Sequence, residues 1–263
     1  MTTKSKNADT RKRKTYSAPA LEKGLDILEL LSTEAEGLSI SEIVSRLGRS
    51  VGELFRMLVV LEQRGYVSIP DGSDKYVLSL KLFGMAHRFP PVKRLTTVAR
   101  PIMHKLAFEI EQSCHLVIYY EGKGHVLVQE DSPSARIFSV RLGAEAPLIS
   151  TCSGHVLLAF SDEQQRAQMI NKIPNLTKAQ EKEVQKVAKR VQKQGYEIIK
   201  SSQTLGVQDI GYPVFDYTDN IVAALVVPFV EYLDGSHSIG IDVVGEFVQS
   251  AAHELSASLG YQL

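Results

Sequence analysis

The sequence predicts a mixed α+β protein with a winged helix-turn-helix at the N-terminal end, a linker helix and an α/β domain behind it. Two observations indicate this. Helical periodicities and a hairpin follow one another within residues 19–78. Apolar strand-like segments with helices before and after them fill residues 112–263. We therefore expect a basic flexible arm at 1–16, the winged domain at 17–88, the linker helix at 89–111 and the α/β domain at 112–263.

Composition fits a soluble, cytoplasmic protein of one or two domains. The chain has 263 residues, of which 44% are hydrophobic and 23% charged. It contains no apolar run long enough for a membrane span and no secretory signal, and we expect its two cysteines to be thiols. Residues 1–95 carry 16 Lys and Arg against 11 Asp and Glu, whereas residues 96–263 carry 14 against 19. The basic front indicates an anionic partner, although such a difference also arises by chance.

The first two helices have clear start signals. Residues 19–33 begin with a proline, and their leucines recur at helical spacing, which predicts an apolar stripe of Leu21, Leu25, Leu28 and Leu31. Residues 39–47 open with the capping box Ser39-x-x-Glu42, and Gly48 can end that helix in a left-handed conformation.

A second capping box, Ser50-x-x-Glu53, opens a third helix that runs to about Arg64. Its spacing turns one face inward, namely Val51, Leu54, Leu58 and Leu61. The opposite face carries Arg49, Gly52, Arg56, Val59 and Gln63. An apolar inner seam with an outward arginine is typical of a DNA-reading helix. Glu53 is expected to cap the helix, and reading of a cytosine amino group is the alternative.

Strand-like residues 66–69 and 76–78, joined by turn residues, complete the motif as a wing. The candidate DNA contacts are Arg49, Ser50, Gly52, Glu53, Arg56 and Lys75. The basic run Arg11, Lys12, Arg13 and Lys14 is interpreted as an arm that follows the phosphate backbone or enters a minor groove. A solubilising tail is the alternative for that run.

After Pro90-Pro91, apolar residues recur at helical spacing to Ile110, and Pro101 is expected to kink or divide this helix. The helix can connect the domains and contribute a dimer contact, so we expect a homodimer or a larger homo-oligomer. The predicted strands behind it are 115–120, 125–129, 136–140, 209–216 and 221–230. The predicted helices are 151–160, 161–171 capped by Ser161, 177–194 and 240–259.

The chain from about residue 20 to 260 resembles the IclR family of bacterial transcriptional regulators. The matching stretches are LEKGLDILELLS (21–32), SISEIVSRLG (39–48), LEQRGYV (61–67), YVLSLKLFGMA (76–86), QSCHLVIYYEG (112–122), SGHVLLAF (153–160), GYEI (195–198), GVQDIGYPVFD (206–216) and IVAALVV (221–227). The resemblance implies a winged helix-turn-helix joined to a GAF-like effector-binding domain, a dimer or tetramer, an operator in double-stranded DNA, and control of catabolic genes by a small organic or aromatic acid. It implies no cofactor.

The resemblance also implies an effector pocket. Its loop matches Thr151, Cys152, Ser153 and Gly154, where amides at a helix N-terminus favour an anion, with simple helix capping as the alternative. Asp209 stands where the family commonly has cysteine, and Val226 and Pro228 lie in a strand that often has serines. These departures, like Ser50 to Glu53 in the reading helix, indicate a different effector and an operator sequence of its own.

Parts of the sequence also allow three other classes of function. Cys152 and His155 share a helical face, which allows a thiol enzyme or, with a distant histidine, a zinc site. No H-E-x-x-H, C-x-x-C or phosphate-loop motif accompanies them, so no catalytic residue and no metal ligand is assigned. A winged helix used purely for protein interaction is the third alternative. Salt-sensitive binding to DNA distinguishes the regulator from it.

Overall fold

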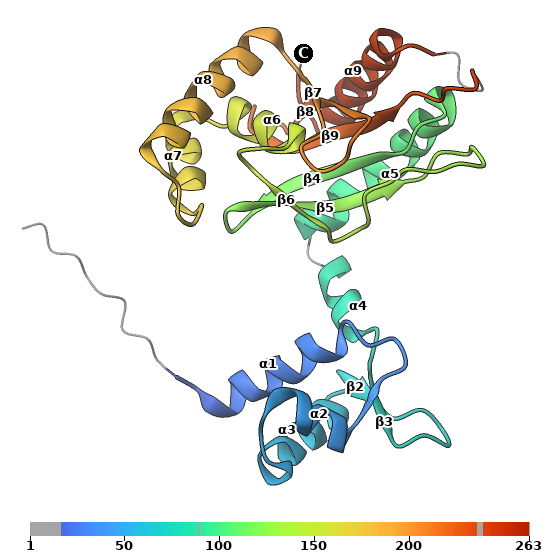
Figure 1. Ribbon diagram of the computed structural model, residues 1–263, viewed down its shortest axis with the longest axis vertical. Coiled ribbons are helices and arrows are strands. Elements are labelled where there is room, and N and C mark those ends of the chain that lie inside the picture. The colour runs from blue at the N-terminus through green and yellow to red at the C-terminus, as the bar shows by residue number, and fades with distance from the viewer. Residues whose placement is uncertain (1–16, 89, 236–238, 263) are drawn as a thin grey trace, which may run out of the picture. The chain divides into compact units, whose positions relative to one another are not determined.

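The computed structural model describes residues 17–88, 90–235 and 239–262 of this α+β protein. It divides into two compact units, Met1–Phe89 and Pro90–Leu263, called here the N-terminal and C-terminal units (Figure 1). The basic run from Arg11 to Lys14 lies outside the described residues.

The N-terminal unit has the expected order of helices and wing. Its elements are α1 (Pro19–Leu31), β1 (Leu38–Ser39), α2 (Ile40–Leu47), α3 (Val51–Gln63), β2 (Val67–Ser68), β3 (Lys75–Leu78) and α4 (Lys81–Arg88). Two of them, β1 and α4, were not predicted. Because β1 pairs with β3 in a small antiparallel sheet of order β1-β3-β2, the wing is anchored to the start of α2.

The buried face of α1 differs from the predicted leucine stripe. Ile27 and Leu31 are buried against Leu54 and Leu58 of α3, whereas Leu21 is 63% exposed and Leu25 is also exposed. At about 100° per residue, Leu21 and Leu25 point well away from the direction of Ile27 and Leu31. Periodicity identified the helix and half of its stripe correctly, since Leu31 is buried and Leu28 packs against the same core, but contact with α3 buries Ile27 rather than Leu21 and Leu25. Val51, predicted to face inward, is also exposed.

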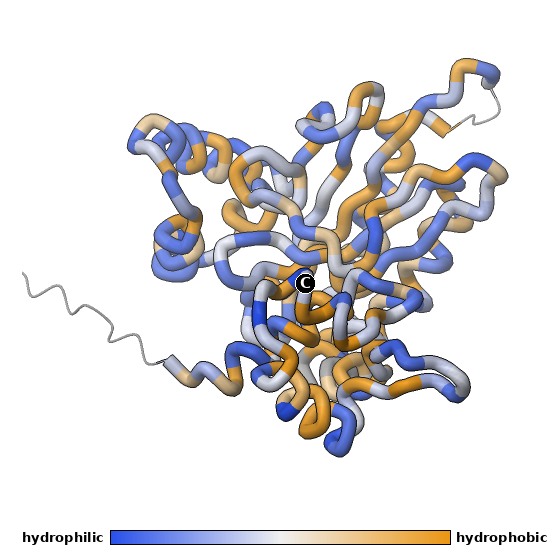
Figure 2. The backbone as a smooth tube through the Cα atoms, turned by 60° about the horizontal axis from the view of Figure 1, so that its bottom comes forward, coloured by the Kyte–Doolittle hydropathy of each residue, from blue (hydrophilic) through white to orange (hydrophobic). Residues whose placement is uncertain are grey.

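The C-terminal unit is built on one antiparallel sheet of order β6-β5-β4-β9-β8-β7. The strands are β4 (Cys114–Tyr120), β5 (Lys123–Glu130), β6 (Glu145–Pro147), β7 (Glu197–Lys200), β8 (Val207–Phe215) and β9 (Ile221–Val230). The helices are α5 (Pro90–Ile110), α6 (Cys152–Phe160), α7 (Glu163–Asn171), α8 (Lys178–Gln194) and α9 (Ile241–Ser258). Apolar residues concentrate in the strands and on the inner sides of these helices (Figure 2).

Each face of the sheet has its own hydrophobic core. On one face, α5 and α9 pack against residues such as Leu116, Ile210 and Leu225. On the other face, α6 and then α8 cover residues that include Val117 and Val226. The helix expected to connect the domains is α5, and it contributes a buried face to the first core while carrying Pro101 inside the helix.

Two local predictions in the C-terminal unit are wrong. Residues 136–140 form no strand, because the free edge of β5 pairs instead with β6. The predicted cap Ser161 donates its hydroxyl to the Leu157 carbonyl oxygen at 2.7 Å. Asp162 caps α7 instead, accepting from the Gln165 amide at 2.7 Å. Ser161 thus completes the end of α6, and the next helix starts one residue later.

Two glycines allow α6 to lie unusually close to its surroundings. A Cβ atom on Gly154 would clash with the Leu148 backbone, and one on Gly211 of β8 would lie 2.7 Å from the Cys152 Sγ. A real Cβ essentially never approaches another atom that closely. Any residue larger than glycine at position 154 or 211 would therefore push the first turn of α6 away from its present position.

We expect Gly154→Ala to lower the free energy of unfolding by about 1–3 kcal/mol, because the new methyl group overpacks a rigid backbone contact. Gly245→Ala is the matched control, since a Cβ there meets nothing nearer than the Tyr212 hydroxyl at 3.8 Å. Alanine within α9 should stabilise by about 0.5–1 kcal/mol. Urea unfolding followed by circular dichroism measures both, and equal values for the two variants would contradict the close seating of α6.

Candidate functional site

The N-terminal end of α3 is held by one carboxylate. Glu53 accepts hydrogen bonds from the Ser50 amide at 3.1 Å and the Ser50 hydroxyl at 2.9 Å, and its second oxygen meets the Lys23 Nζ at 2.8 Å. The Lys23 hydrogen bond, followed by that of the Ser50 amide, lowers the pKa of Glu53 to about 2. The capping interpretation of Glu53 is confirmed, and the ion pair with α1 adds a contact that the sequence pattern did not show.

The outward side of α3 is open within the N-terminal unit. Gly52 and Arg56 are exposed, and Arg49 lies just before the helix with its guanidinium 3.5 Å from Asp26. Phe55, which the sequence periodicity assigned to neither face of the helix, is also exposed. Lys75 lies apart from these residues, as the first residue of β3 in the wing, opposite Ser39 of β1.

A cavity of about 60 Å³ lies at the N-terminal end of α6, on the α6 face of the sheet. Five predicted effector residues line it: Thr151, Cys152, Ser153, Asp209 and Val226. Gly154 and Pro228, also predicted, do not line it: Gly154 packs against the Leu148 backbone, and Pro228 lies opposite Asp209 in β9 without reaching the cavity. Sequence reasoning missed the other lining residues, namely His115, Val126, Phe138, Val140, Glu145, Ala146, Ser201, Gln203 and Thr204.

The α6 end of this cavity is capped from within. The Thr151 hydroxyl donates to the Pro147 carbonyl oxygen at 2.7 Å and accepts from the Gly154 amide at 3.2 Å. Helix capping by Thr151 is thus present, and it leaves the rest of the first turn facing the cavity lined by Cys152 and Ser153.

Two groups that line the cavity, the Asp209 carboxyl and the His115 imidazole, have shifted pKa values. Burial raises the pKa of Asp209, and a hydrogen bond from Ser201 partly offsets this. Burial lowers the pKa of His115 to about 4, so its imidazole is neutral near pH 7. None of the described residues that line the cavity is a lysine or an arginine. Any positive potential there comes from the N-terminal end of α6.

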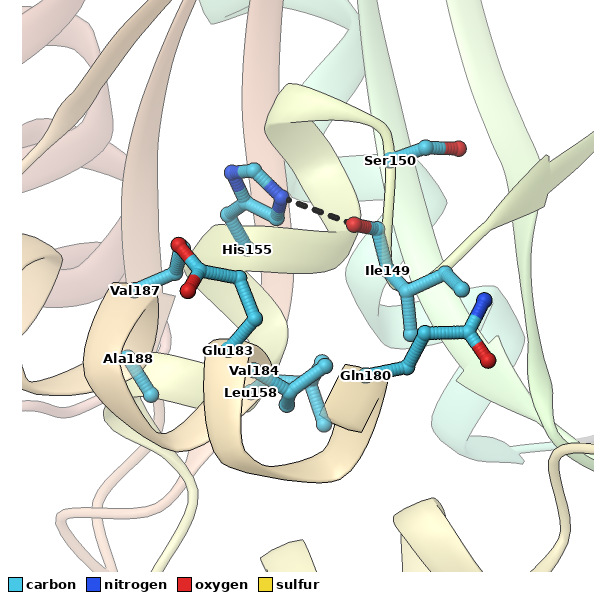
Figure 3. A pocket seen from close by; sticks show the side chains of 9 residues that line it. All are labelled: Ile149, Ser150, His155, Leu158, Gln180, Glu183, Val184, Val187 and Ala188. Carbon is cyan, nitrogen blue, oxygen red and sulfur yellow. Dashed lines mark hydrogen bonds between the residues drawn. The ribbon is translucent and has the colours of Figure 1, made fainter. Parts of the chain in front are cut away.

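A second, larger cavity of about 220 Å³ lies between α6 and α8. Figure 3 shows its lining, with His155 donating to the Ile149 carbonyl oxygen at 3.2 Å. The lining is mostly aliphatic, and its polar members are Ser150, His155, Gln180 and Glu183. No residue predicted to bind effector lies in this second cavity.

Behind α6, the carboxylate of Glu197 in β7 is fully buried and binds two basic side chains. His155 Nδ1 lies 2.8 Å from Glu197 Oε2, and Arg190 of α8 donates to both carboxylate oxygens at 3.0 and 2.5 Å. Burial acts to raise the pKa of Glu197, but the hydrogen bonds from His155 and Arg190 lower it on balance. Three elements, α6, α8 and β7, are tied together at this carboxylate.

Comparison with known proteins agrees with both units. The description "Bacterial transcriptional regulator IclR C-terminal" matches residues 92–257, and "IclR helix-turn-helix domain" matches residues 20–68. The chain belongs to the IclR family of bacterial transcriptional regulators. It is 29% identical over 261 residues to the HTH-type transcriptional regulator KdgR of Escherichia coli (strain K12), covering 97% of each chain.

Solved structures of IclR proteins share the fold. The Thermotoga maritima IclR superposes with a TM-score of 0.71 at 23% identity, covering 92% of this chain and 98% of that one. An IclR homolog from Microbacterium hydrocarbonoxydans, crystallised with 4-hydroxybenzoate, gives a TM-score of 0.75 at 18% identity, covering 92% and 99%.

Membership of the IclR family identifies a transcriptional regulator rather than an enzyme. The geometry agrees, because the buried Cys152 thiol donates to the Glu197 carbonyl oxygen at 3.6 Å while His155 binds the Glu197 carboxylate. Burial raises the pKa of the Cys152 thiol well above its ordinary value, opposite to what a thiolate nucleophile needs. Among the described residues, no cluster of acidic, histidine and cysteine side chains could hold a metal ion.

In the part of the chain that the structure describes, no helix is both long and apolar enough to cross a lipid bilayer.

We expect Glu197→Gln in this regulator to lower the free energy of unfolding at pH 7 by about 2–3 kcal/mol, below the range for a fully buried pair because Arg190 is half exposed. The folded-state pKa of Glu197 lies below its ordinary value of 4.5. The carboxylate therefore stabilises fully above pH 4.5, and this contribution is lost as pH falls through the folded-state value.

Urea unfolding at pH 7 and at acidic pH measures both effects. The variant should lose less stability on acidification than the parent chain. Glu183→Gln, which changes an exposed carboxylate on α8, is the control and should leave the pH profile unchanged. If the dependence of stability on pH is the same for Glu197→Gln and the parent chain, His155 and Arg190 do not stabilise the ionised form of Glu197.

Proposed function

We propose that this IclR-family regulator reads an operator in double-stranded DNA with α3 and controls catabolic genes in response to a small organic or aromatic acid. The observation that carries the proposal is the open outward side of α3, where Gly52 and Arg56 are exposed while Glu53 caps the helix from within the unit. Arginine at such a position forms bidentate hydrogen bonds to guanine in the major groove. Arg49 and Lys75 are proposed as further DNA contacts, together with Ser50 and the basic run 11–14.

The cavity at α6 is the proposed effector site. Thr151, Cys152 and Ser153 lie at a helix N-terminus, which favours a carboxylate without a basic side chain. An IclR homolog of the same fold was crystallised in complex with 4-hydroxybenzoate, which supports a small acid as the effector. Asp209 on the other side of the cavity disfavours a second anionic group.

A homodimer or homotetramer follows from the proposed readout, since direct readers of duplex DNA bind paired half-sites as symmetric dimers. Effector and operator are coupled reciprocally. A ligand that weakens DNA binding must bind less tightly to the DNA complex by the same factor.

A protein-interaction role for the winged domain is the second candidate, and the exposed Val51 and Phe55 on α3 are the observation that favours it. Gel shifts with the DNA that flanks the protein's own gene separate the two. Binding that weakens steeply with salt supports the regulator, and absence of DNA binding with and without effectors supports the interaction role.

We expect Arg56→Ala to weaken specific operator binding by about 1–3 kcal/mol, because it removes one base-reading side chain. Footprinting and titration against selected genomic fragments measure the change. Arg100→Ala removes the same charge from α5 in the C-terminal unit and should leave the footprint intact. Identical footprints for Arg56→Ala and the parent chain would show that the outward face of α3 is not the reading face.

We expect Ser153→Pro to weaken binding of organic acids roughly tenfold or more, because proline removes one amide from the first turn of α6. Calorimetry with a panel that includes 4-hydroxybenzoate measures it. Ser153→Ala keeps the amide and separates loss of the hydroxyl from loss of the N–H group. Equal affinities for the proline variant and the parent chain would reject this end of α6 as the carboxylate site.

A further inference from the structure

Two polar side chains that line the α6 cavity, one buried and one half-buried, have no part in docking a carboxylate at the helix end. They are His115 of β4 and Asp209 of β8. The register explains why they share a cavity. His115 lies opposite Val226 of β9, Val226 lies opposite Gly211 of β8, and Asp209 is two residues from Gly211 on the same face of the sheet. Both side chains therefore rise from the sheet toward the space below α6.

His115 lacks a hydrogen-bond partner for a buried ring nitrogen. The residue is 6% exposed, and its Nδ1 contacts no donor or acceptor among the described residues. An unpaired buried polar atom is costly, and most such atoms in folded proteins are satisfied by protein, water or ligand. Because His115 lines the cavity, a molecule that enters the cavity can supply the partner.

Asp209 restricts what that partner can be. A carboxylate oxygen accepts hydrogen bonds and repels another anion at short range. None of the described lining residues is a lysine or arginine that could neutralise a second anion, and the carboxylate of the lining residue Glu145 is already paired with Lys123. The part of a ligand that meets His115 and Asp209 is therefore expected to carry no negative charge and to form hydrogen bonds, which hydroxyl groups can do as donors and as acceptors.

We propose that this cavity binds a small polyhydroxylated acid, whose carboxylate meets the N-terminal end of α6 and whose hydroxyl groups bind Asp209 and the Nδ1 of His115. This inference rests on the proposed effector site and narrows its ligand class to non-aromatic hydroxy acids. The neutral lining groups Ser201, Gln203 and Thr204 provide further partners for hydroxyls. Phe138 and Val140 close one side with apolar surface.

Ligand hydroxyl groups suit hydrogen bonding to Asp209 and His115 better than a ligand ammonium group does. Burial raises the pKa of Asp209, so the site favours the uncharged carboxyl more than an exposed aspartate does. An ammonium group needs the charged carboxylate, whereas a hydroxyl can donate to a carboxylate or accept from a carboxylic acid. A neutral His115 ring likewise accepts from or donates to a hydroxyl according to its tautomer.

Calorimetry on the full chain tests the class of ligand with four small acids and one aromatic acid. The probes are glycerate, gluconate, lactate, serine and 4-hydroxybenzoate. Lactate lacks one hydroxyl of glycerate, and serine replaces the 2-hydroxyl with ammonium. We expect glycerate or gluconate to bind at least roughly tenfold more tightly than lactate, serine and 4-hydroxybenzoate. Each of these three has a single hydroxyl, and a site that binds two hydroxyls rejects a molecule that leaves one of its partners unpaired. Preference for serine or 4-hydroxybenzoate, or no binding of either polyhydroxylated acid, overturns the inference.

Two variants locate the preference within the cavity. Asp209→Asn and His115→Gln should each reduce the affinity for the preferred hydroxy acid at least roughly tenfold and reduce its advantage over lactate. Glu183→Gln, in the neighbouring cavity between α6 and α8, is the control and should bind as the parent chain does. Thermal unfolding of each variant without ligand checks folding. Unchanged affinity in folded Asp209→Asn and His115→Gln overturns the assignment of these residues.

The same variants distinguish failure of the inference from failure of the effector site. Suppose that 4-hydroxybenzoate binds, that Ser153→Pro abolishes its binding and that the hydroxy acids do not bind. The effector site then stands and the ligand class is wrong. If ligands bind equally to the parent chain and to Ser153→Pro, the site itself is wrong.

Discussion

The buried carboxylate of Glu197 ties α6 and α8 to the face of the sheet on which the proposed effector cavity lies. It stands on β7, opposite Gly211, and receives hydrogen bonds from His155 of α6 and Arg190 of α8. A carboxylate removed from water is tolerated when charged donors satisfy it, and those donors are then held in place. This interaction orients α6, and the rest of the cavity depends on where α6 begins.

Close packing at two glycines, together with the ion pair of Glu197, sets the position of α6. The absence of side chains at Gly154 and Gly211 lets the first turn of α6 lie against the Leu148 backbone and lets the Cys152 thiol sit over β8. The helix N-terminus consequently faces His115 and Asp209 across a small space. A site for a polar molecule thus arises from apolar packing and one buried ion pair, neither of which contacts the proposed ligand's hydroxyl groups.

A similar device operates in the N-terminal unit. Glu53 binds Ser50 of its own helix and Lys23 of α1, and these contacts hold the start of α3 in place. Lys23 also pairs with a carboxylate that would otherwise repel the DNA phosphates. The Glu53 carboxylate beside the proposed DNA surface is thereby paired with a cation within the unit. Gly52 and Arg56 remain on the outward side, where the helix-turn-helix of an IclR regulator is proposed to meet its operator.

The sequence by itself determined the fold class, the IclR family, the capping boxes at Ser39 and Ser50 and the order of helices and wing. These features are local, since caps, turns and periodicity involve residues a few positions apart. The sequence also named five residues of the cavity, through resemblance. The sequence pattern predicted a strand at 136–140 that does not form. The edge of the sheet is instead completed by β6, which pairs with β5, and local sequence does not show which segment will pair there.

Only the tertiary structure decided which residues of α1 are buried, that Glu197 joins His155 and Arg190, and that His115 shares a cavity with Asp209. Such contacts join residues far apart in the chain, and they depend on strand register and on the seating of one helix. A one-residue change in register would turn His115 to the other face of the sheet. No local pattern carries that information, because the same alternating segment can be placed in either register.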